Sequence, residues 1–376
     1  MRLLFVTGEA SGDLYASRVI RKLLLIEPRA EIWAVGGVYC KEAGARLLLD
    51  SSRWGAIGVS EALKRLPLYL RGLFRIARFL EGRRPDLLVM VDFGAFNRRV
   101  SRLARRAKIR RLYYIPPGCW SRSERVAKRA LGLAEVVVSP LPWSAELLSR
   151  LGQRVLRVGH PLLEVVREER GLCSPKGAPD PRRPKVALLP GSREAELRHC
   201  LPAMARACEE IRRNFPGVRF VVSMAPNVRP KEVRGAFPKG LPVSFLVGAG
   251  GPLREADVAV VVSGTATLEA ALWRCPHVCI YRGSPGMSLQ YRLIGRGIRF
   301  VSLPNIVLQR PVVPELLQAD ANPLRIALEV RRLLLDRSVR EGMLSAFEEI
   351  EQILDGPPAS EVVAEAAVRM ARGERV

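Results

Sequence analysis

The sequence contains few aromatic residues and no long uncharged apolar run. Phe, Trp and Tyr together make up 6% of the 376 residues, which leaves little material for the stacking platforms of single-stranded nucleic-acid binders. No helix-turn-helix, zinc-finger or RNP sequence is present, so we expect no nucleic-acid partner. Arg or Lys interrupts every apolar stretch before it reaches the roughly 18 residues that a membrane-spanning helix requires. Any membrane contact should therefore be peripheral.

Acidic residues are also scarce, and the cysteines form no recognisable set. With 61 Lys and Arg against 37 Asp and Glu, the formal net charge is +24, which favours a polyanionic partner such as an anionic lipid or a phosphorylated substrate. Among the seven cysteines, the close pair Cys275 and Cys279 lacks a second pair at zinc spacing, so we predict reduced thiols and no metal. The apolar start of the chain is cut short at Gly8 before a signal peptide's apolar core develops, which predicts a cytoplasmic protein.

Apolar runs and amphipathic helical patterns alternate along the chain, which is typical of parallel βαβ units. We predict an α/β protein with two Rossmann-like domains whose parallel sheets face each other across a cleft. The predicted divisions are an N-terminal domain (1–170), a proline-rich linker (171–185), a C-terminal domain (186–340) and C-terminal helices (341–376), whose return to the first domain is left open. The expected strands are residues 3–6, 32–35, 87–91, 111–115, 136–139 and 155–158, then residues 186–189, 219–223, 243–247, 258–262, 278–281 and 300–303.

The first expected strand runs into the turn Gly-Glu-Ala-Ser-Gly-Asp, residues 8–13. Such a turn at a strand's carboxyl end is the default ligand position in an open α/β sheet. Its glycines allow close backbone approach, and Glu9 and Asp13 place carboxylates at a helix N-terminus, where the dipole favours anions. An ordinary βα turn with Asp13 near a cap would explain the glycines, but not an acid on each side of Ser11.

Two similar turns follow strands in the second domain, at residues 191–193 (Gly-Ser-Arg) and residues 263–265 (Ser-Gly-Thr). The backbone N–H groups of such turns can bind a diphosphate, with Arg193 neutralising charge and Glu269 accepting hydrogen bonds from ribose hydroxyls. Ser192 could equally serve as a simple N-cap. Without a dinucleotide fingerprint or a Walker lysine, the pair favours a nucleotide-sugar site.

Asp92 ends the strand at residues 87–91, where a carboxylate could take a proton from an attacking hydroxyl. A structural Asp that caps the following helix is an equally good interpretation. Among the three histidines, only His160 is expected near the cleft.

Residues 61–80 combine apolar and basic side chains in a pattern suited to the surface of an anionic bilayer. An ordinary helix with buried leucines and exposed arginines is the alternative. The residues that we expect to face the membrane are Leu66, Leu70, Leu73, Phe74, Arg71 and Arg75.

With these residues identified, the chain resembles the lipid-A-disaccharide synthase family of inverting glycosyltransferases, which have the two-domain GT-B fold. The resemblance runs nearly end to end. It is carried by residues 8–13, Asp92 with Phe96 and Asn97, Val158-Gly-His160, Leu189-Pro-Gly-Ser-Arg193 with Glu196, Ser263-Gly-Thr265 with Leu268 and Glu269, Tyr281-Arg282, Ser302-Leu-Pro-Asn305, and Pro314-Glu-Leu-Leu-Gln318.

The resemblance implies transfer from UDP-2,3-diacylglucosamine to 2,3-diacylglucosamine 1-phosphate, giving a β-1,6-linked disaccharide and UDP at the inner face of the cytoplasmic membrane. It implies acylated UDP-glucosamine and acylated glucosamine phosphate as partners, peripheral contact with an anionic membrane surface, and no cofactor or metal; a homodimer is left open. The implied catalytic residues are Asp92, the base, and Glu9. The implied acceptor-side residues are Gly8, Ser11, Asp13, Asn97 and Trp120. The implied UDP-sugar-binding residues are Gly191, Ser192, Arg193, Glu196, Ser263, Gly264, Thr265, Glu269, Tyr281, Asn305 and Gln318.

Three segments of the first domain depart from the family pattern. Residues 92–97 read Asp-Phe-Gly-Ala-Phe-Asn, so that Ala95 replaces a second acid; residues 116–122 have an altered loop that includes Cys119; and residues 38–40 are atypical. UDP-sugar transfer is therefore a firmer expectation than the identity of the acceptor. The alternatives are a paralogue acting on another lipid or polyprenyl acceptor, a UDP-N-acetylglucosamine 2-epimerase, and a non-enzymatic binder of anionic surfaces.

Overall fold

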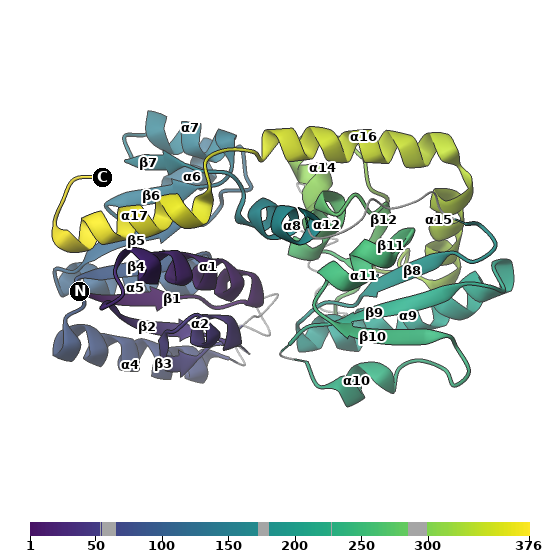
Figure 1. The fold of residues 1–376 in the computed structure, drawn as a ribbon, viewed down its shortest axis with the longest axis horizontal. Helices are drawn as coiled ribbons and strands as arrows, with labels where there is room; N and C mark the ends of the chain where they lie inside the picture. Colours follow the sequence, from purple (N-terminus) through teal and green to yellow (C-terminus); the bar gives the residue numbers. More distant parts are fainter. Residues whose placement is uncertain (53, 55–64, 172–179, 227, 285–298) are drawn as a thin grey trace. The chain divides into compact units, whose positions relative to one another are not determined.

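The computed structural model describes residues 1–52, 54, 65–171, 180–226, 228–284 and 299–376. The chain forms two compact units, one of Met1–Glu164 with Leu354–Val376 and one of Val165–Ile353 (Figure 1). Each unit is a parallel sheet covered by helices, which confirms the predicted α/β class.

The sheet of the first unit has the strand order β3-β2-β1-β4-β5-β6-β7 within the described residues. Its central strand β4 is a fully buried run of Leu, Val and Met, as expected for a parallel strand covered on both faces. The strands are β1 (Arg2–Val6), β2 (Glu31–Gly36), β3 (Arg46–Asp50), β4 (Leu87–Val91), β5 (Arg110–Tyr114), β6 (Val136–Ser139) and β7 (Val155–Arg157). The helices are α1 (Ala10–Ile26), α2 (Val38–Glu42), α4 (Leu66–Arg83), α5 (Gly94–Arg106), α6 (Glu124–Ala127), η1 (Lys128–Ala130), α7 (Pro142–Arg150) and α17 (Ala359–Arg372).

The sheet of the second unit has the order β10-β9-β8-β11-β12-β13 within the described residues. Its strands are β8 (Lys185–Leu189), β9 (Arg219–Met224), β10 (Val243–Val247), β11 (Val258–Val262), β12 (His277–Tyr281) and β13 (Glu315–Leu317). Its helices are α9 (Glu194–Asn214), α10 (Pro230–Arg234), α11 (Gly250–Glu255), α12 (Thr265–Leu272), α14 (Leu303–Leu308), α15 (Pro323–Leu335) and α16 (Arg337–Ile353).

Two strand assignments differ from the sequence analysis. Residues 300–303, expected as a strand, instead lead into α14, because the Val301 and Ser302 N–H groups donate to the Glu315 carboxylate and Pro304 suits the first turn of a helix. The sixth strand of that sheet is β13. In the first unit, β3 is an edge strand that the sequence analysis did not include.

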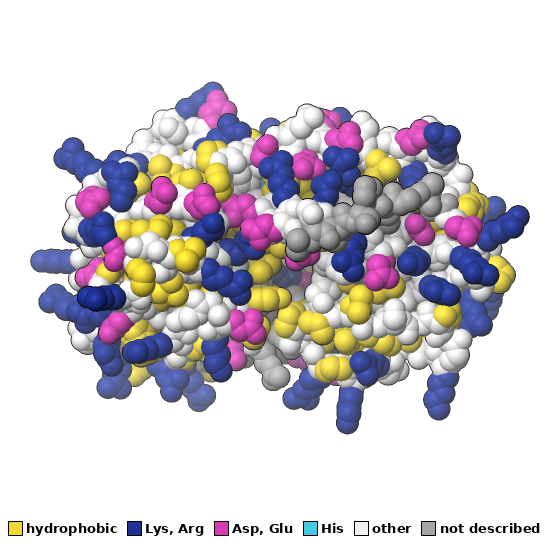
Figure 2. All heavy atoms as spheres, viewed as in Figure 1, with side chains coloured by type: hydrophobic (Ala, Val, Ile, Leu, Met, Phe, Trp, Pro, Cys, Tyr) yellow, Lys and Arg dark blue, Asp and Glu magenta, His cyan; other side chains and the backbone are white. Residues whose placement is uncertain are grey.

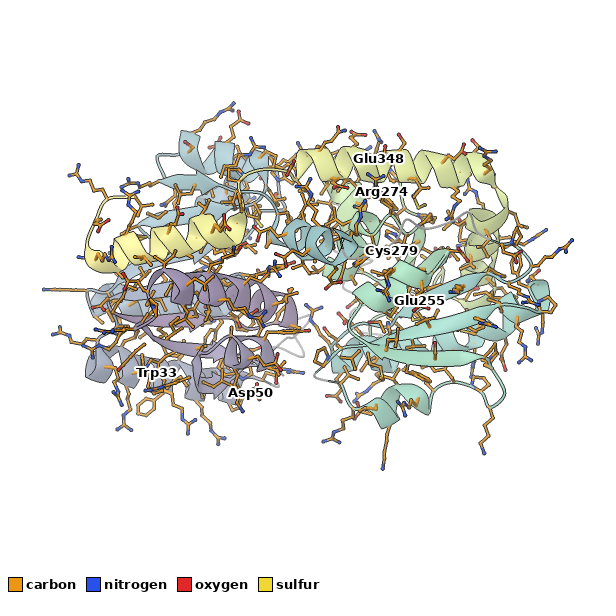
Figure 3. The ribbon with its side chains drawn as sticks, viewed as in Figure 1. Trp33, Asp50, Glu255, Arg274, Cys279 and Glu348 are labelled. Atoms are coloured by element: carbon orange, nitrogen blue, oxygen red, sulfur yellow. The ribbon has the colours of Figure 1, made fainter. Side chains whose placement is uncertain are left out.

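The units divide inside α8 (Pro161–Gly171), whereas the sequence analysis placed the boundary after residue 170. Glu164 accepts a hydrogen bond from Ser360 N of the first unit, while Arg170 donates to Leu272 O of the second. The chain returns to the first unit after α16, so α16 and α17 belong to different units. Arg274 of the second unit pairs with Glu348 of α16 at 2.9 Å (Figure 3). Residues 172–179 of the expected linker lie outside the described residues.

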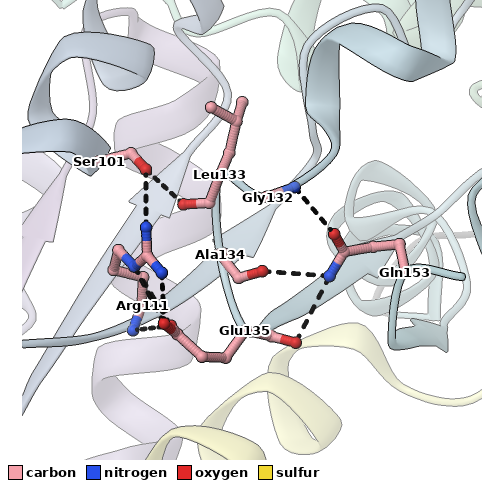
Figure 4. Close-up of polar contacts among 7 residues, drawn as sticks. All are labelled: Ser101, Arg111, Gly132, Leu133, Ala134, Glu135 and Gln153. Carbon is pink, nitrogen blue, oxygen red and sulfur yellow. Dashed lines mark hydrogen bonds and ion pairs between the residues drawn. The ribbon is translucent and has the colours of Figure 1, made fainter. Parts of the chain in front are cut away.

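A partly buried polar network lies at the amino ends of β5, β6 and β7 (Figure 4). The Arg111 backbone N–H and guanidinium both donate to Glu135, and Arg111 also reaches Ser101, whose hydroxyl donates to Leu133 O. Gln153 links the carbonyls of Ala134 and Glu135 to the Gly132 N–H. The Arg111 guanidinium therefore has a structural role. Other Lys and Arg side chains are spread over the face shown in Figure 2 rather than gathered in one patch.

Candidate functional site

The residues singled out in the sequence cluster at two topological switch points. Strand order reverses between β1 and β4 in the first sheet and between β8 and β11 in the second, and ligands of open α/β sheets bind at such points. Gly8 follows β1 and Asp92 follows β4, while Arg193 lies after β8 and Gly264 after β11. Each unit thus places two of the predicted turns on neighbouring strands.

In the first unit, the Gly8 turn and the Asp92 turn are in direct contact. A Cβ atom on Gly8 would lie 2.2 Å from the Phe93 ring, so only glycine allows this approach. Asp92 and Phe93 both have left-handed backbone conformations, with φ values of 48° and 52°. Non-glycine residues rarely adopt them except where surrounding structure holds them, often at functional sites.

Three hydrogen bonds hold the Asp92 backbone in place. Its carbonyl accepts hydrogen bonds from Asn97 Nδ2 at 2.8 Å and Tyr113 Oη at 2.9 Å, and its N–H donates to Tyr114 O at 3.0 Å. The N-cap residue of α5 is Phe93, so Asp92 does not occupy the capping position considered in the sequence analysis. Its side chain is partly buried at the carboxyl end of the central strand β4.

Asn97 is fully buried and ties the two switch-point strands together. Besides Asp92 O, its Nδ2 lies 3.3 Å from Val6 O and 3.4 Å from Val91 O. The structure thus places Asn97 beneath the site as a support, whereas the resemblance implied an acceptor-side role.

Asp13 also supports the backbone. Its carboxylate accepts hydrogen bonds from the N–H groups of Gly37 (2.7 Å), Tyr39 (3.0 Å) and Cys40 (3.3 Å) at the start of α2. Gly36 is required there, since a Cβ would lie 2.9 Å from Asp13 Oδ1. Glu9, by contrast, is the partly buried N-cap residue of α1 and forms no side-chain capping bond. Asp13 is therefore the acid of this turn whose carboxylate supports the backbone of α2.

Trp120 and His160 pack together with ring centroids 5.7 Å apart. Burial lowers the pKa of His160 to about 3, and its Nδ1 accepts a hydrogen bond from Leu162 N, so the imidazole is neutral with its proton on Nε2. Cys119 is buried, and burial together with the nearby Asp92 charge raises the pKa of its thiol. Cys119 is therefore a protonated neighbour of the Asp92 turn.

In the second unit, the turn before α9 is occupied by the protein's own carboxylate. Glu196, 3% exposed, accepts hydrogen bonds from Ser192 N (3.0 Å) and Arg193 N (3.2 Å) and pairs with the Arg193 guanidinium. Gly191 has a φ of 94°, which favours glycine. The Ser192 and Arg193 amides of this turn are therefore already bonded, and Glu196 acts as a cap.

The turn before α12 lacks such a side-chain cap. Gly264, with a φ of 142°, is the N-cap residue and has no side-chain capping bond. Ser263 Oγ donates to Val301 O at 2.8 Å, and Thr267 Oγ1 donates to Gly264 O at 2.8 Å while accepting from Leu303 N. The Ser263 and Thr267 side chains thus fix the shape of the turn. Thr265, which is partly buried, is the first residue of the helix. This N-terminus is the better candidate for an anion.

Glu269 lies one turn into α12. Burial, and secondarily the charge of Glu169 on α8, raises the pKa of Glu269 to about 7. The group can therefore change protonation near neutral pH. Sequence reasoning missed Glu169, because only the fold brings α8 close to α12.

The remaining donor-side candidates are engaged in loop structure. Asn305 Nδ2 donates to Val313 O and Glu315, and its Oδ1 accepts from Val312 N and Val313 N, so its amide is fully used. Gln318 Oε1 accepts from Gly283 N, and Gln318 N donates to Tyr281 O. Asn305 is a scaffold for this loop, with Glu315 beside it. Glu315 lay within a motif of the resemblance but was not singled out.

Helix α4 carries the predicted membrane-facing residues. Leu66, Leu70 and Phe74 are 43%, 56% and 65% exposed at intervals of four residues, and Arg71 and Arg75 are exposed beside them. Leu73 instead packs against the core, as the ordinary-helix interpretation required. Residues 61–64 lie outside the described residues. None of the described helices is long and apolar enough to cross a membrane.

Across the described part of the chain, no group of three or more His, Cys, Asp or Glu residues could hold a metal ion.

Comparison with known proteins gives consistent matches over the whole length. A family model described as Lipid-A-disaccharide synthetase matches residues 3–356. The lipid-A-disaccharide synthase of Geobacter sulfurreducens is 32% identical over 375 residues, covering 98% of this chain and 97% of that protein. The synthase of Anaeromyxobacter dehalogenans is 35% identical over 378 residues, covering 99% and 98%.

Solved structures share the fold at low sequence identity. UDP-GlcNAc 2-epimerase from Neisseria meningitidis, bound to UDP-GlcNAc, aligns with a TM-score of 0.65 at 13% identity, covering 98% of this chain and 100% of that one. The glycotransferase of kitacinnamycin aligns with a TM-score of 0.59 at 16% identity, covering 98% of each. These neighbours establish the GT-B class of fold.

Proposed function

The chain belongs to the lipid-A-disaccharide synthase family, and from that premise we propose that it joins UDP-2,3-diacylglucosamine to 2,3-diacylglucosamine 1-phosphate. It is a glycosyltransferase of lipid A biosynthesis; the two substrates are the proposal. The products would be the β-1,6-linked disaccharide 1-phosphate and UDP. The observation that carries the proposal is a carboxylate, Asp92, held in a constrained backbone at the switch point of one sheet, together with an uncapped helix N-terminus at the switch point of the other.

Asp92 is proposed as the general base. Its carboxylate takes the proton of the acceptor 6-hydroxyl as that oxygen attacks C1 of the donor sugar. The bond from C1 to the diphosphate oxygen breaks on the opposite face, which inverts the anomeric centre and releases UDP. Glu9, on the neighbouring strand's turn, is proposed to bind acceptor hydroxyls near the base.

The α12 N-terminus is proposed to bind the diphosphate, with Glu269 accepting hydrogen bonds from the ribose. Backbone N–H groups in the first turn and the helix dipole stabilise the charge that builds up on the leaving group. Arg193 lies on the adjacent strand's turn and would add a cation, although its pairing with Glu196 weakens its field. We expect turnover without an added metal ion.

Helix α4 is proposed to rest on the inner face of the cytoplasmic membrane. Its exposed apolar residues could enter the interface while the arginines meet anionic headgroups. Tyr69 of α4 contacts Phe93 with ring centroids 6.0 Å apart, so this helix and the Asp92 turn share an aromatic cluster. An acylated acceptor held by α4 would therefore have a short path to the base.

The decisive experiment measures disaccharide and UDP formation with both substrates, with each alone, and with Asp92→Asn. We expect product only when both are present, and a loss of about 100-fold or more in Asp92→Asn with UDP binding retained. Asp50→Asn is the matched control, since Asp50 also ends a strand of this sheet but at its edge. Undiminished turnover in Asp92→Asn would refute the assignment of the base.

A different lipid or polyprenyl acceptor is the second candidate. It is favoured by the exposed Ala95 at the start of α5, where the family pattern has an acid. This candidate would be supported if the protein bound UDP but turned over the donor only when such an acceptor was supplied.

A further inference from the structure

Tyr113 of β5, which lies behind the Asp92 turn, helps to hold the constrained backbone conformation of Asp92. Asp92 and Phe93, with φ values of 48° and 52°, form two successive left-handed residues with side chains. Such a pair would relax towards extended backbone unless neighbouring groups held it. Relaxation would move the Asp92 Cβ atom and redirect its carboxylate.

Tyr113 is fully buried and gives its only hydroxyl proton to Asp92 O at 2.9 Å. Burial, and secondarily the Asp92 charge, raises the pKa of Tyr113, so the hydroxyl stays protonated and remains a donor. Asn97 also donates to this carbonyl, but its Nδ2 lies within reach of two further carbonyls. Tyr113 is thus the donor dedicated to Asp92.

We infer that Tyr113 is a positioning residue that sets the direction of the Asp92 carboxylate through the Asp92 carbonyl. This inference rests on the proposed role of Asp92 as the base. Tyr113 has no exposed surface, so it acts on turnover only through the turn that it holds. Small misplacements of a catalytic group lower the chemical rate more than substrate binding.

The next residue in the strand provides a matched control. Tyr114 is also fully buried, but alternation along β5 directs its side chain to the other face of the sheet. Within the described residues, the Tyr114 hydroxyl has no hydrogen-bond partner. Tyr113→Phe and Tyr114→Phe therefore remove the same atom from the same strand, and only the first removes a bond to Asp92.

The test compares kcat, KM for both substrates, UDP affinity and melting temperature in the two variants. We expect Tyr113→Phe to lower kcat about tenfold, with KM and UDP affinity within about twofold of the parent, and Tyr114→Phe to leave kcat unchanged. In an Asp92→Asn background, Tyr113→Phe should cause no further loss of the residual rate, because the positioned group is already gone.

Each result decides a different claim. If Asp92→Asn retains full turnover, the proposed base is wrong; if it is inactive while Tyr113→Phe matches Tyr114→Phe, the positioning role is overturned. An equal further loss in the Asp92→Asn background would also overturn it, because the effect would then be structural. Should Tyr113→Phe fail to fold, Asn97→Ser, which removes the other donor to the same carbonyl, is expected to lower kcat with KM unchanged, and an unchanged kcat would count against the role.

Discussion

Asp13 and Glu9 lie four residues apart in one turn, yet their surroundings assign them different roles. Three backbone N–H groups donate to the Asp13 carboxylate, whereas Glu9 makes no side-chain capping bond. We predict that Asp13→Asn lowers the free energy of unfolding by roughly 1–3 kcal/mol, because charge-assisted bonds to buried donors are lost. Urea denaturation measures this.

Glu9→Gln is the comparison within the same turn and should lower turnover, because Glu9 is proposed to bind acceptor hydroxyls. If Asp13→Asn were as stable as the parent and its KM for the acceptor rose, Asp13 would contact substrate after all.

Glu269 predicts a pH dependence of UDP binding. Because its pKa is raised to about 7, the carboxylate is mostly protonated below that pH and loses acceptor capacity towards ribose hydroxyls. UDP affinity should therefore increase as pH rises through 7. Glu169→Gln removes the neighbouring negative charge and should move this increase to lower pH.

Calorimetric titration of UDP from pH 5.5 to 8.5 checks this, and comparing variants cancels the ionisation of UDP itself. Glu168→Gln, the adjacent exposed acid on α8, should keep the parent's profile. Identical profiles for Glu169→Gln and the parent would show that Glu269 does not bind UDP in the proposed way.

At the scale of one element, α4 has two apolar faces, of which only one is buried. Gly72, Ile76, Phe79 and Leu80 pack inward, while Leu70 and Phe74 remain exposed. We predict that Leu70→Ser with Phe74→Ser weakens binding to vesicles containing anionic phosphatidylglycerol by tenfold or more, because buried apolar area drives interfacial binding. Cosedimentation measures this.

The control for α4 is Leu25→Ser on α1, a leucine that is 77% exposed but lies outside the proposed membrane contact. It should bind vesicles like the parent. Arg71→Gln with Arg75→Gln should weaken binding mainly at low salt, where charge attraction is least screened. Equal binding by all variants would exclude α4 as the membrane contact.

Across the whole molecule, the sequence predicts features made by residues that are neighbours in the chain. It does not predict features that depend on contacts between distant residues. Strand ends such as Asp92 and Gly264 were found because apolar runs and turn residues lie next to each other in the chain. The roles of Asp13 and Glu196 could not be found, since an acid near a helix start looks the same whether it binds a ligand or caps a helix. Residues 300–303 were misassigned because the partner of their backbone, Glu315, lies further along the chain.

The sequence also did not show how the chain passes between the two units. Periodicity predicts helices in α16 and α17 but does not say which core each one covers. The structure assigns α16 to the second unit and α17 to the first, where α17 lies along α1 (Figure 1). Lys22 pairs with Glu361, Arg372 pairs with Glu27, and Arg110 donates to Met370 O at 2.9 Å.

This arrangement predicts the effect of deleting residues 354–376. The first unit would lose the helix that covers α1 and part of its sheet, whereas the second would keep its whole chain segment. The tryptophans report on this selectively, since Trp33, Trp54, Trp120 and Trp143 lie in the first unit and Trp273 in the second. We expect the fluorescence-detected melting temperature to fall by 10 °C or more, as for loss of roughly 2.5–5 kcal/mol from a domain of this size, and UDP affinity to change less than about threefold. Deleting only residues 374–376 should leave both unchanged. Loss of UDP binding in the longer deletion would show that the donor site depends on the first unit, and an unchanged melting temperature would show that α17 contributes little to it.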